Sequence, residues 1–369
     1  MVRLYYSRIK AWYKRHERGI SPIAFAAGFV WDNITLQRID LLYENVMFAW
    51  NLFEAMAVIV LINAHEAGYW RNRFTNKVVP FLPVLLQFAF GALLSAFVVF
   101  YFRSGSIYVS WPFLLLLVGL FVGNDFFRKR YVKLTFQISI LFIALFTYFV
   151  FLVPILIGKF GTLVFGASGL LALSATGGLL YAFFRFLPQR IQQSKKGLIV
   201  SIGGIYALFH VLYFANIIPP IPLSVKDIGL YHSLERVEAH MPEYLYEVTF
   251  EPAPWYDPFS KTSSTFHWQE GESLYMYTAI FAPGRIDTTI AHRWSFFDTS
   301  QGHWVEYARI PFSIAGGRAQ GYRGYTFLRQ PAEGKWRVDV ITPNGQVLGR
   351  KTFQVVINQS PPQLETGLR

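Results

Sequence analysis

The chain is divided by one apolar run, LIVSIGGIYALFHVLYFANIIPPIP (Leu198–Pro222), which has no Lys, Arg, Asp or Glu and ends with three prolines within four residues. A helix of about 20 apolar residues spans a bilayer. Pro219, Pro220 and Pro222 cannot continue such a helix, because proline lacks a backbone N–H. Apolar segments precede this run and a β-type pattern follows it. The sequence therefore predicts a membrane-embedded first part and a water-soluble second part.

The composition agrees with this division. Of 369 residues, 53% are hydrophobic and 15% are charged, which is too apolar for a single soluble domain. Residues 1–222 carry 20 Lys and Arg against 7 Asp and Glu, whereas residues 223–369 carry 14 against 15. The basic excess belongs to the apolar part, which argues against a nucleic-acid partner. The chain has no Cys, which excludes disulfides and Cys-ligated zinc.

Seven segments are apolar enough to be predicted as transmembrane helices, with 20–222 as the transmembrane domain. They are Ile20–Gln37, Leu41–Ala64, Val79–Phe102, Ile107–Gly123, Leu134–Ile157, Phe160–Phe184 and Leu198–Ile218. The first is the weakest, because it is short and contains Asp32 and Asn33. The basic segment 1–19 precedes it without the longer apolar region of a cleaved signal peptide. We interpret this segment as a cytoplasmic anchor; an amphipathic helix on anionic lipid is the alternative.

The basic residues of the loops indicate the orientation of these helices. If the N-terminus is cytoplasmic, the cytoplasmic segments hold 17 Lys and Arg, whereas the opposite loops hold 3, namely Arg38, Arg103 and Lys159. This is the asymmetry that the positive-inside rule describes. Seven helices then place the C-terminal part outside the cytoplasm. We expect a multi-pass protein of the bacterial inner membrane whose C-terminal domain is periplasmic.

Residues 244–357 have the alternation of β-strands. Strands rich in β-branched and aromatic residues are predicted at Tyr244–Glu251, Ser273–Ala282, Ile286–Phe297, His303–Phe312, Tyr322–Leu328, Trp336–Thr342 and Val347–Val356. Pro343-Asn344-Gly345 is a hairpin signal between the last two. Seven short strands predict an all-β antiparallel sandwich of immunoglobulin type. Residues 223–243 are expected to be a linker or short helix, Glu251–Gly271 a long ordered loop, and 358–369 a disordered tail.

Several short motifs of the β part resemble a known family. They are His292-Arg293-Trp294, Gly316-Gly317-Arg318, Gly321-Tyr322-Arg323-Gly324-Tyr325, Gly334-Lys335-Trp336-Arg337-Val338-Asp339-Val340 and Phe353-Gln354-Val355. Together they resemble the bacterial domain of unknown function 2914 over residues 270–357. The apolar part resembles the uncharacterised multi-span region often placed before that domain. The resemblance implies a bacterial envelope protein with an extracytoplasmic β module, and it implies no activity.

Polar residues inside the predicted helices are the first candidate functional group, because ionisable side chains are costly in a bilayer. They are Asp32, Asp40, Glu44, Asn51, Glu54 and His210. Those from Asp40 to Glu54 share one face of the second predicted helix. A proton or cation path through Glu44, Glu54 and His210 is one interpretation. Hydrogen bonding between helices, with Asp40 and Glu44 at the membrane interface, is the other.

Aromatic and arginine residues of the β part are the second candidate group. Exposed aromatic rings beside arginines suit stacking on sugars or docking of a protein. The candidates are Trp255, Tyr256, His292, Arg293, Trp294, Arg318, Tyr322 and Arg323. The alternative is that Trp294 and Trp336 fill the core while Trp255 and Tyr256 cover the domain or touch lipid headgroups. His292, Asp298 and His303 match no metal-ligand spacing, and no nucleophile motif is present, so we expect no metal, cofactor or catalytic residue.

Three functions remain open from the sequence. The leading hypothesis is a non-enzymatic binding or assembly module for an envelope component: a protein, a glycan or a lipid-linked molecule. An ion- or proton-coupled transporter would use the intramembrane acidic residues and His210. A membrane enzyme on lipid-linked substrates would need carboxylates or histidines at the outer membrane face, and only Asp40, Glu44, Asp227 and His232 could contribute.

Single cysteines test the predicted orientation, because the chain has none of its own. We expect a membrane-impermeant thiol reagent to label Ser263→Cys and Gln359→Cys in intact cells, but not Ser194→Cys. The physical reason is that the first two positions follow the last membrane helix and the third lies in a basic cytoplasmic loop. Labelling of Ser194→Cys alone would contradict this orientation.

Overall fold

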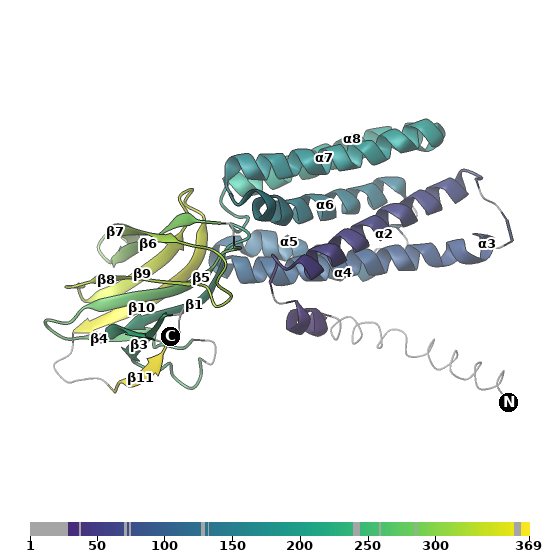
Figure 1. Ribbon diagram of the computed structural model, residues 1–369. Coiled ribbons are helices and arrows are strands. Elements are labelled where there is room, and N and C mark those ends of the chain that lie inside the picture. Colours follow the sequence, from purple (N-terminus) through teal and green to yellow (C-terminus); the bar gives the residue numbers. More distant parts are fainter. Residues whose placement is uncertain are drawn as a thin grey trace, which may run out of the picture.

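The protein consists of a helical bundle and a β-rich region that lie end to end (Figure 1). The computed structural model describes residues 29–36, 38–69, 72–73, 75–126, 130–131, 133–238, 244–257, 260–284, 286–357 and 363–369. Within them, six helical segments are long and apolar enough to cross a membrane. The coarse division that the sequence predicts is therefore confirmed: an apolar helical region precedes a β-rich region.

The helices follow the predicted apolar segments closely. They are α2 (Leu42–Glu66), α3 (Thr75–Val78), a 3-10 turn η1 (Val79–Phe81), α4 (Leu82–Ser104), α5 (Ile107–Phe126), α6 (Leu134–Ile157), α7 (Thr162–Phe186) and α8 (Pro188–Phe214). Residues 29–35 are also helical. The basic segment 1–19 and the first part of the first predicted helix lie outside the described residues. Six apolar helices are thus observed, and the seventh is observed only in its last turns.

Helix α8 begins ten residues before the predicted start at Leu198. Pro188 occupies its first turn, where the missing N–H has no intrahelical partner to lose. Gln and Lys residues then extend it, because long unbranched side chains favour helix. The helix ends at Phe214, and the proline run follows after a turn at Asn216. The apolar run alone therefore underestimates the length of α8, because the first ten residues of the helix are more polar.

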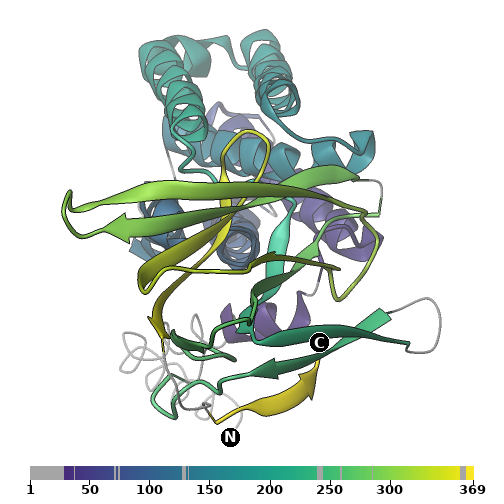
Figure 2. The ribbon, with the colours of Figure 1, turned by 90° about the vertical axis from the view of Figure 1, so that its left-hand side faces the viewer.

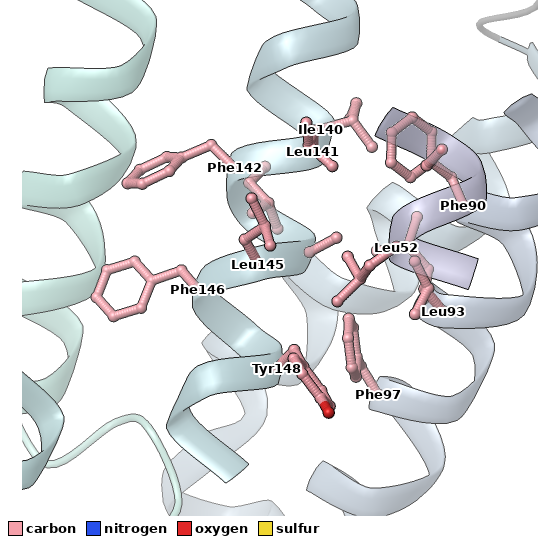
Figure 3. Packing of buried hydrophobic residues seen from close by; sticks show 14 of the residues in the cluster. Leu52, Phe90, Leu93, Phe97, Ile140, Leu141, Phe142, Leu145, Phe146 and Tyr148 are labelled. Atoms are coloured by element: carbon pink, nitrogen blue, oxygen red, sulfur yellow. The ribbon is translucent and has the colours of Figure 1, made fainter. Parts of the chain in front are cut away.

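Helix α6 is the centre of the bundle. Of its most apolar stretch 72% is buried, compared with 17% for α8. Figure 3 shows Phe142 and Phe146 of α6 pointing to one side, while other α6 side chains face Leu52 of α2 and Phe97 of α4. Phe146 stacks on Phe209 of α8 at a ring-centroid distance of 4.7 Å. The outer surfaces of the other helices expose apolar side chains, as expected of a bundle surrounded by lipid.

A chain of buried amides ties four helices together near the end of the bundle remote from the β region. Asn63 of α2 donates to Gln137 of α6 at 2.7 Å, and Gln137 donates to the Tyr131 carbonyl at 2.5 Å. The Tyr131 hydroxyl bonds to Asn124 of α5, and Asn124 donates to the Gln87 carbonyl of α4 at 2.9 Å. Polar groups inside a bilayer stabilise helix contacts in this way, because no water is available to them.

The β region contains three sheets. The strands are β1 (Ser224–Tyr231), β2 (Ser233–Glu238), β3 (Tyr244–Phe250), β4 (Thr265–Trp268), β5 (Leu274–Phe281), β6 (Thr288–Asp298), β7 (His303–Ile314), β8 (Tyr322–Leu328), β9 (Gly334–Ile341), β10 (Val347–Ile357) and β11 (Glu365–Leu368). Their orders are β1-β5-β8, β4-β10-β9-β6-β7 and β11-β3-β2. Figure 2 looks onto these strands, with the helices behind them.

Two of the sheets share a hydrophobic core. Trp294 and Trp336 of the five-stranded sheet and Met276 of the β1-β5-β8 sheet belong to one buried cluster. The third sheet packs through Val248 and Phe250 against Tyr277 of β5. All described pairings are antiparallel except β4 with β10, which is parallel. The predicted seven strands are present, and four more join them.

The sequence interpretation was wrong for three connecting segments. Residues 223–243, expected as a linker or short helix, contain β1 and β2. The expected loop Glu251–Gly271 contains β4, and the expected disordered tail contains β11, although 358–362 lie outside the described residues. Strands β1, β2 and β11 carry Lys, Asp, Glu or Gly, which are poor strand formers, whereas β4 (TFHW) has strand-forming residues but is only four residues long. Pairing with partners distant in sequence, such as β11 with β3, overrides this local preference.

The β region rests directly on the helix ends. Gln346, in the turn after β9, donates to the Ile218 carbonyl at 3.2 Å. Phe160, between α6 and α7, packs against a buried β cluster that includes Leu348 and Ile280. A Cβ on Gly105 would lie 2.6 Å from Pro219, so the α4–α5 turn approaches the proline run too closely for a larger residue. The junction is therefore packed rather than joined by a single free linker.

Replacing Asn63 with Leu is expected to destabilise the bundle by about 1 kcal/mol, since interhelical hydrogen bonds in membranes are worth roughly 0.6–1.7 kcal/mol. Unfolding of the purified chain in detergent measures this. The Asn51→Leu variant is the control, because Asn51 donates only within its own helix, to Met47. The double variant Asn63→Leu/Gln137→Leu should lose less than the sum of the two single variants; strict additivity would contradict the contact.

Candidate functional site

The acidic residues at the start of α2 lie in a charged corner rather than along a path. Arg38 forms a bidentate pair with Asp40 at 3.0 and 2.7 Å. Glu44 is buried and accepts from the Arg38 backbone N–H at 3.2 Å. Asn51 lies about two helical turns after Glu44 and donates to the Met47 carbonyl. On the predicted shared face, Asp40 and Glu44 thus hold the Arg38 segment before α2, and Asn51 bonds within the helix.

The remaining intramembrane candidates are separated. Ser95 of α4 donates to Asp32 at 2.5 Å. His210 of α8 lies 2.9 Å from the Tyr206 carbonyl through Nδ1, and its ring packs on Tyr206 at 4.2 Å. Glu54 of α2 is half-buried. Among the described residues no hydrogen bond or ion pair joins Glu54 to His210. Of these groups, Asp32 bonds to another helix and His210 bonds within its own, so the described contacts do not join them into a path.

His292 and Trp294, predicted as ligand-binding residues, lie in the core, so that prediction was wrong. Both are fully buried. His292 bridges Thr278 of β5 at 3.0 Å and Thr326 of β8 at 2.9 Å, and Trp294 also donates to Thr326. Burial lowers the pKa of His292 to about 3, so the ring is neutral at physiological pH. Alternation along β6 places these two residues inward and Arg293 outward.

The other predicted binding residues do not form one surface. Trp255 and Tyr256 are 92% and 73% exposed and form an edge-to-face pair at 6.0 Å. The Arg318 guanidinium lies over the Tyr322 ring at 5.0 Å, and Tyr322 packs against a buried cluster. Arg323 follows Tyr322 directly in β8, so it points to the opposite face of the strand. Trp255 and Tyr256 remain an exposed pair, separate from these arginines.

A basic surface lies across the five-stranded sheet, and of the binding residues predicted from the sequence only Arg293 belongs to it. We call it the arginine face. The cross-strand row Arg350–Asp339–Arg293–Arg309 runs over β10, β9, β6 and β7, because each neighbouring pair is in register. The next outward positions on β9 are Arg337 and Lys335, and Lys335 lies close to Trp304 of β7. Its members are Arg293, Trp304, Glu306, Arg309, Lys335, Arg337, Asp339 and Arg350.

Asp339 is the buried centre of this face. Its carboxylate accepts from Arg293 at 2.7 Å and from Arg350 at 2.5 and 3.1 Å. Burial by itself would raise the pKa of Asp339, but the hydrogen bonds from Arg350 and Arg293 outweigh it and lower that pKa below 3.8. The carboxylate is therefore charged at neutral pH. One negative charge is thus surrounded by three guanidinium groups, which leaves an excess of positive charge.

Arg337 is the cation that Asp339 does not neutralise. Its Nε lies 3.5 Å from Asp339 Oδ2, which is too long for a good hydrogen bond. Its guanidinium lies 4.5 Å from the Trp304 ring centroid, in a cation–π arrangement. The Nε atoms of Arg337 and Arg293 are buried without a hydrogen-bond partner. These two nitrogens are closed to solvent, so contact with an anion would fall to the other N–H groups of the guanidinium.

A second polar cluster joins two histidines and two glutamates beside β4. His232 Nδ1 lies 2.6 Å from Glu272 Oε1, and His232 Nε2 lies 3.2 Å from Glu251 Oε1. His267 Nδ1 lies 2.7 Å from the other Glu251 oxygen. The His232 ring stacks on Phe266 at 4.1 Å. Within the described ranges no group of three His, Cys, Asp or Glu has the arrangement of a metal site.

The comparison with protein families gives one match. Residues 287–355 match the family described as protein of unknown function (DUF2914). The chain carries a DUF2914 module. The module includes all of β6, β7, β8 and β9 and nearly all of β10, and every residue of the arginine face lies inside it. The surrounding apolar helices agree with a membrane protein that displays this module.

Other comparisons add little. No curated protein matches the chain. Among solved structures, a β-glucosidase from Listeria innocua is 16% identical over 30% of this chain and 16% of its own, with a TM-score of 0.21. An immunoglobulin-like protein from Pseudomonas aeruginosa is 13% identical over 35% of this chain and 97% of its own, with a TM-score of 0.19. The aligned part thus spans less than a fifth of the β-glucosidase. Scores this low support no argument about fold or activity.

The His232 cluster makes the stability of the β region depend on pH. Burial opposes the charged form of His232, but hydrogen bonds from its ring to Glu251 and Glu272 outweigh burial and raise its pKa above 6.5. A raised pKa stabilises the fold fully below pH 6.5 and ceases to do so as the pH rises through the folded-state value. We therefore expect His232→Gln to lower the melting temperature more at about pH 6 than at about pH 9. An equal decrease at both pH values would contradict this role.

Proposed function

We propose that the chain is a multi-pass protein of the bacterial inner membrane whose DUF2914 module is a periplasmic, immunoglobulin-like sandwich that binds an acidic glycan of the envelope. The leading hypothesis from the sequence, a binding or assembly module, is retained. Its binding surface is changed: the arginine face replaces the buried His292 and Trp294. The arginine face is the observation that carries this proposal.

The chemistry of that face suits carboxylated or phosphorylated sugars. Arg337 has only a long ion pair to Asp339 at 3.5 Å, and Lys335 lies beside Trp304, so both add cationic groups to the bonded pairs of Asp339 with Arg293 and Arg350. Arginine binds planar carboxylate and phosphate groups through two parallel hydrogen bonds. Trp304, half-buried beside Arg337, offers the edge of a ring to a sugar. An acidic sugar would therefore find charge and an apolar contact within one short surface.

The distribution of basic residues over the bundle supports the periplasmic orientation. The ends of α2, α4 and α5 that face the β region carry Arg38 and Arg103. The opposite ends of the helices carry the larger number, which includes Lys77, Arg130, Lys133, Arg185, Arg190, Lys195 and Lys196. Cytoplasmic loops are enriched in Lys and Arg, so the end with the β region corresponds to the extracytoplasmic side.

Binding of an acidic oligosaccharide tests the proposal. The full chain is placed in nanodiscs of zwitterionic lipid and titrated by calorimetry with oligogalacturonate, and with maltohexaose as the neutral comparison. We expect only the acidic oligosaccharide to bind. Arg337→Gln should weaken it about tenfold, since a hydrogen bond to a charged group contributes roughly 1.5–3 kcal/mol. Asp339 keeps its bonds to Arg293 and Arg350 in this variant, so the fold is preserved.

Arg309→Gln is the matched control. Arg309 lies in the same cross-strand row, but it pairs with Glu306 at 3.1 and 3.0 Å and is 54% exposed. We expect its affinity to equal that of the unaltered chain. Equal binding of the acidic and neutral oligosaccharides, or full affinity of Arg337→Gln, would overturn the proposal.

A further inference from the structure

A second basic site lies where the DUF2914 region meets the bundle. An open pocket of about 460 Å³ is lined by the α4–α5 turn, the start of β1 and the start of β10. Its lining includes Arg103 of α4, Lys226 of β1 and Arg350 of β10. The volume is within the range of roughly 300–1,000 Å³ that is usual for small-molecule sites. Three cations from three separate elements thus meet in one cavity.

The charge in this pocket is only partly neutralised by the protein. Arg350 is paired with Asp339. Arg103 donates to the Leu36 carbonyl at 2.6 Å and the Asn33 carbonyl at 2.7 Å, which hold the side chain in place without removing its charge. Two further carboxylates act on these cations: Asp40 pairs with Arg38, and Glu44 accepts from the Arg38 backbone N–H and also attracts Arg103.

Among the described residues no carboxylate forms a hydrogen bond or ion pair with Lys226, although the charge of Asp40 acts on it. Its exposed ammonium lies 5.4 Å from the Phe281 ring centroid, and Arg38 lies over the same ring at 5.2 Å. Burial lowers the pKa of Lys226 most, because it disfavours the charged form. The positive charges of Arg103 and Arg38 lower this pKa further, whereas the negative charge of Asp40 raises it. Positive charges are therefore held together at this point, which an incoming anion would relieve.

The pocket opens at the level of the membrane surface. Its other wall consists of Phe102, Ile107 and Tyr108, which end α4 and begin α5 and which expose 41%, 57% and 75% of their surface. Exposed aromatic residues at the ends of membrane helices lie at the headgroup level. Ser106 and Ser224 add hydroxyl groups to the lining. A molecule with an apolar tail beside α5 and an anionic head at Lys226 and Arg103 fits this arrangement.

We propose that the pocket between α4, β1 and β10 binds the phosphate headgroup of an anionic membrane lipid, with Lys226 and Arg103 as its ligands. This site goes beyond the acidic-glycan function and does not depend on it, because neither residue belongs to the arginine face. Lysine and arginine beside a membrane surface bind anionic lipid through their charge. The apolar wall distinguishes a lipid from a free phosphate, since only a lipid has a chain to place against it.

Native mass spectrometry of the full chain in detergent tests the site. Dioctanoyl phosphatidylglycerol, dioctanoyl phosphatidylcholine and inorganic phosphate are titrated separately. We expect phosphatidylglycerol adducts at a concentration at least tenfold below that needed for phosphatidylcholine. Lys226→Gln should remove this preference and Lys226→Arg should retain it. Lys261→Gln is the control, because Lys261 is also on the β region but pairs with Asp227 at 3.0 Å.

The outcomes separate the sources of the anion. Equal binding of the two lipids, or an unchanged preference in Lys226→Gln, would overturn the proposal. Inorganic phosphate that displaced phosphatidylglycerol at equal concentration would also overturn it, because the apolar wall would then contribute nothing. Arg103→Gln is not used, since Arg103 also holds the 29–36 segment. The oligogalacturonate titration uses different residues, so either proposal can fail alone.

Discussion

The absence of water inside a bilayer is the constraint on which the rest of this structure depends. Backbone N–H and C=O groups must then bond within their own segment, so the first part of the chain is helical. The helical region ends before the proline run that follows α8, because proline cannot continue a helix. From Ser224 onward the backbone pairs between strands instead. The same run packs against Gly105, so the point of exit also fixes where the β region begins.

Charge in the β region is organised by one buried carboxylate. Asp339 lies between Arg293 and Arg350 in a single cross-strand row, so it is stable as an ion only because both neighbours bond to it. Arg337 is then left as an additional cation stacked on Trp304. A structural ion pair and a candidate binding surface thus share the same residues. Removal of Asp339 would affect both, whereas removal of Arg337 separates them.

The two proposed sites lie side by side along β10. Arg350 belongs to the arginine face through Asp339 and also lines the pocket beside Lys226 and Arg103. An acidic sugar on the sheet and a phosphate at the membrane surface would therefore lie on either side of one arginine. The intramembrane carboxylates have a different role here. Asp40 and Glu44 hold Arg38 at the same corner, close to Lys226, and they support the junction between bundle and β region.

The sequence by itself determined the division into helices and strands, because burial in lipid needs long apolar runs and half-buried strands need alternation. It also named Arg293 as a binding candidate, but it gave Arg337 only as part of a family motif and could not tell which residues faced inward. The strand register decides which residues face inward. In the pairing of β6 with β9, the side chains of His292 and Trp294 point into the core. The strands β1, β4 and β11 and the proposed lipid pocket became visible only in the folded structure, because their partners are distant in sequence. Strand β2 pairs with its neighbour β3, but its Glu and Arg residues give it little strand preference.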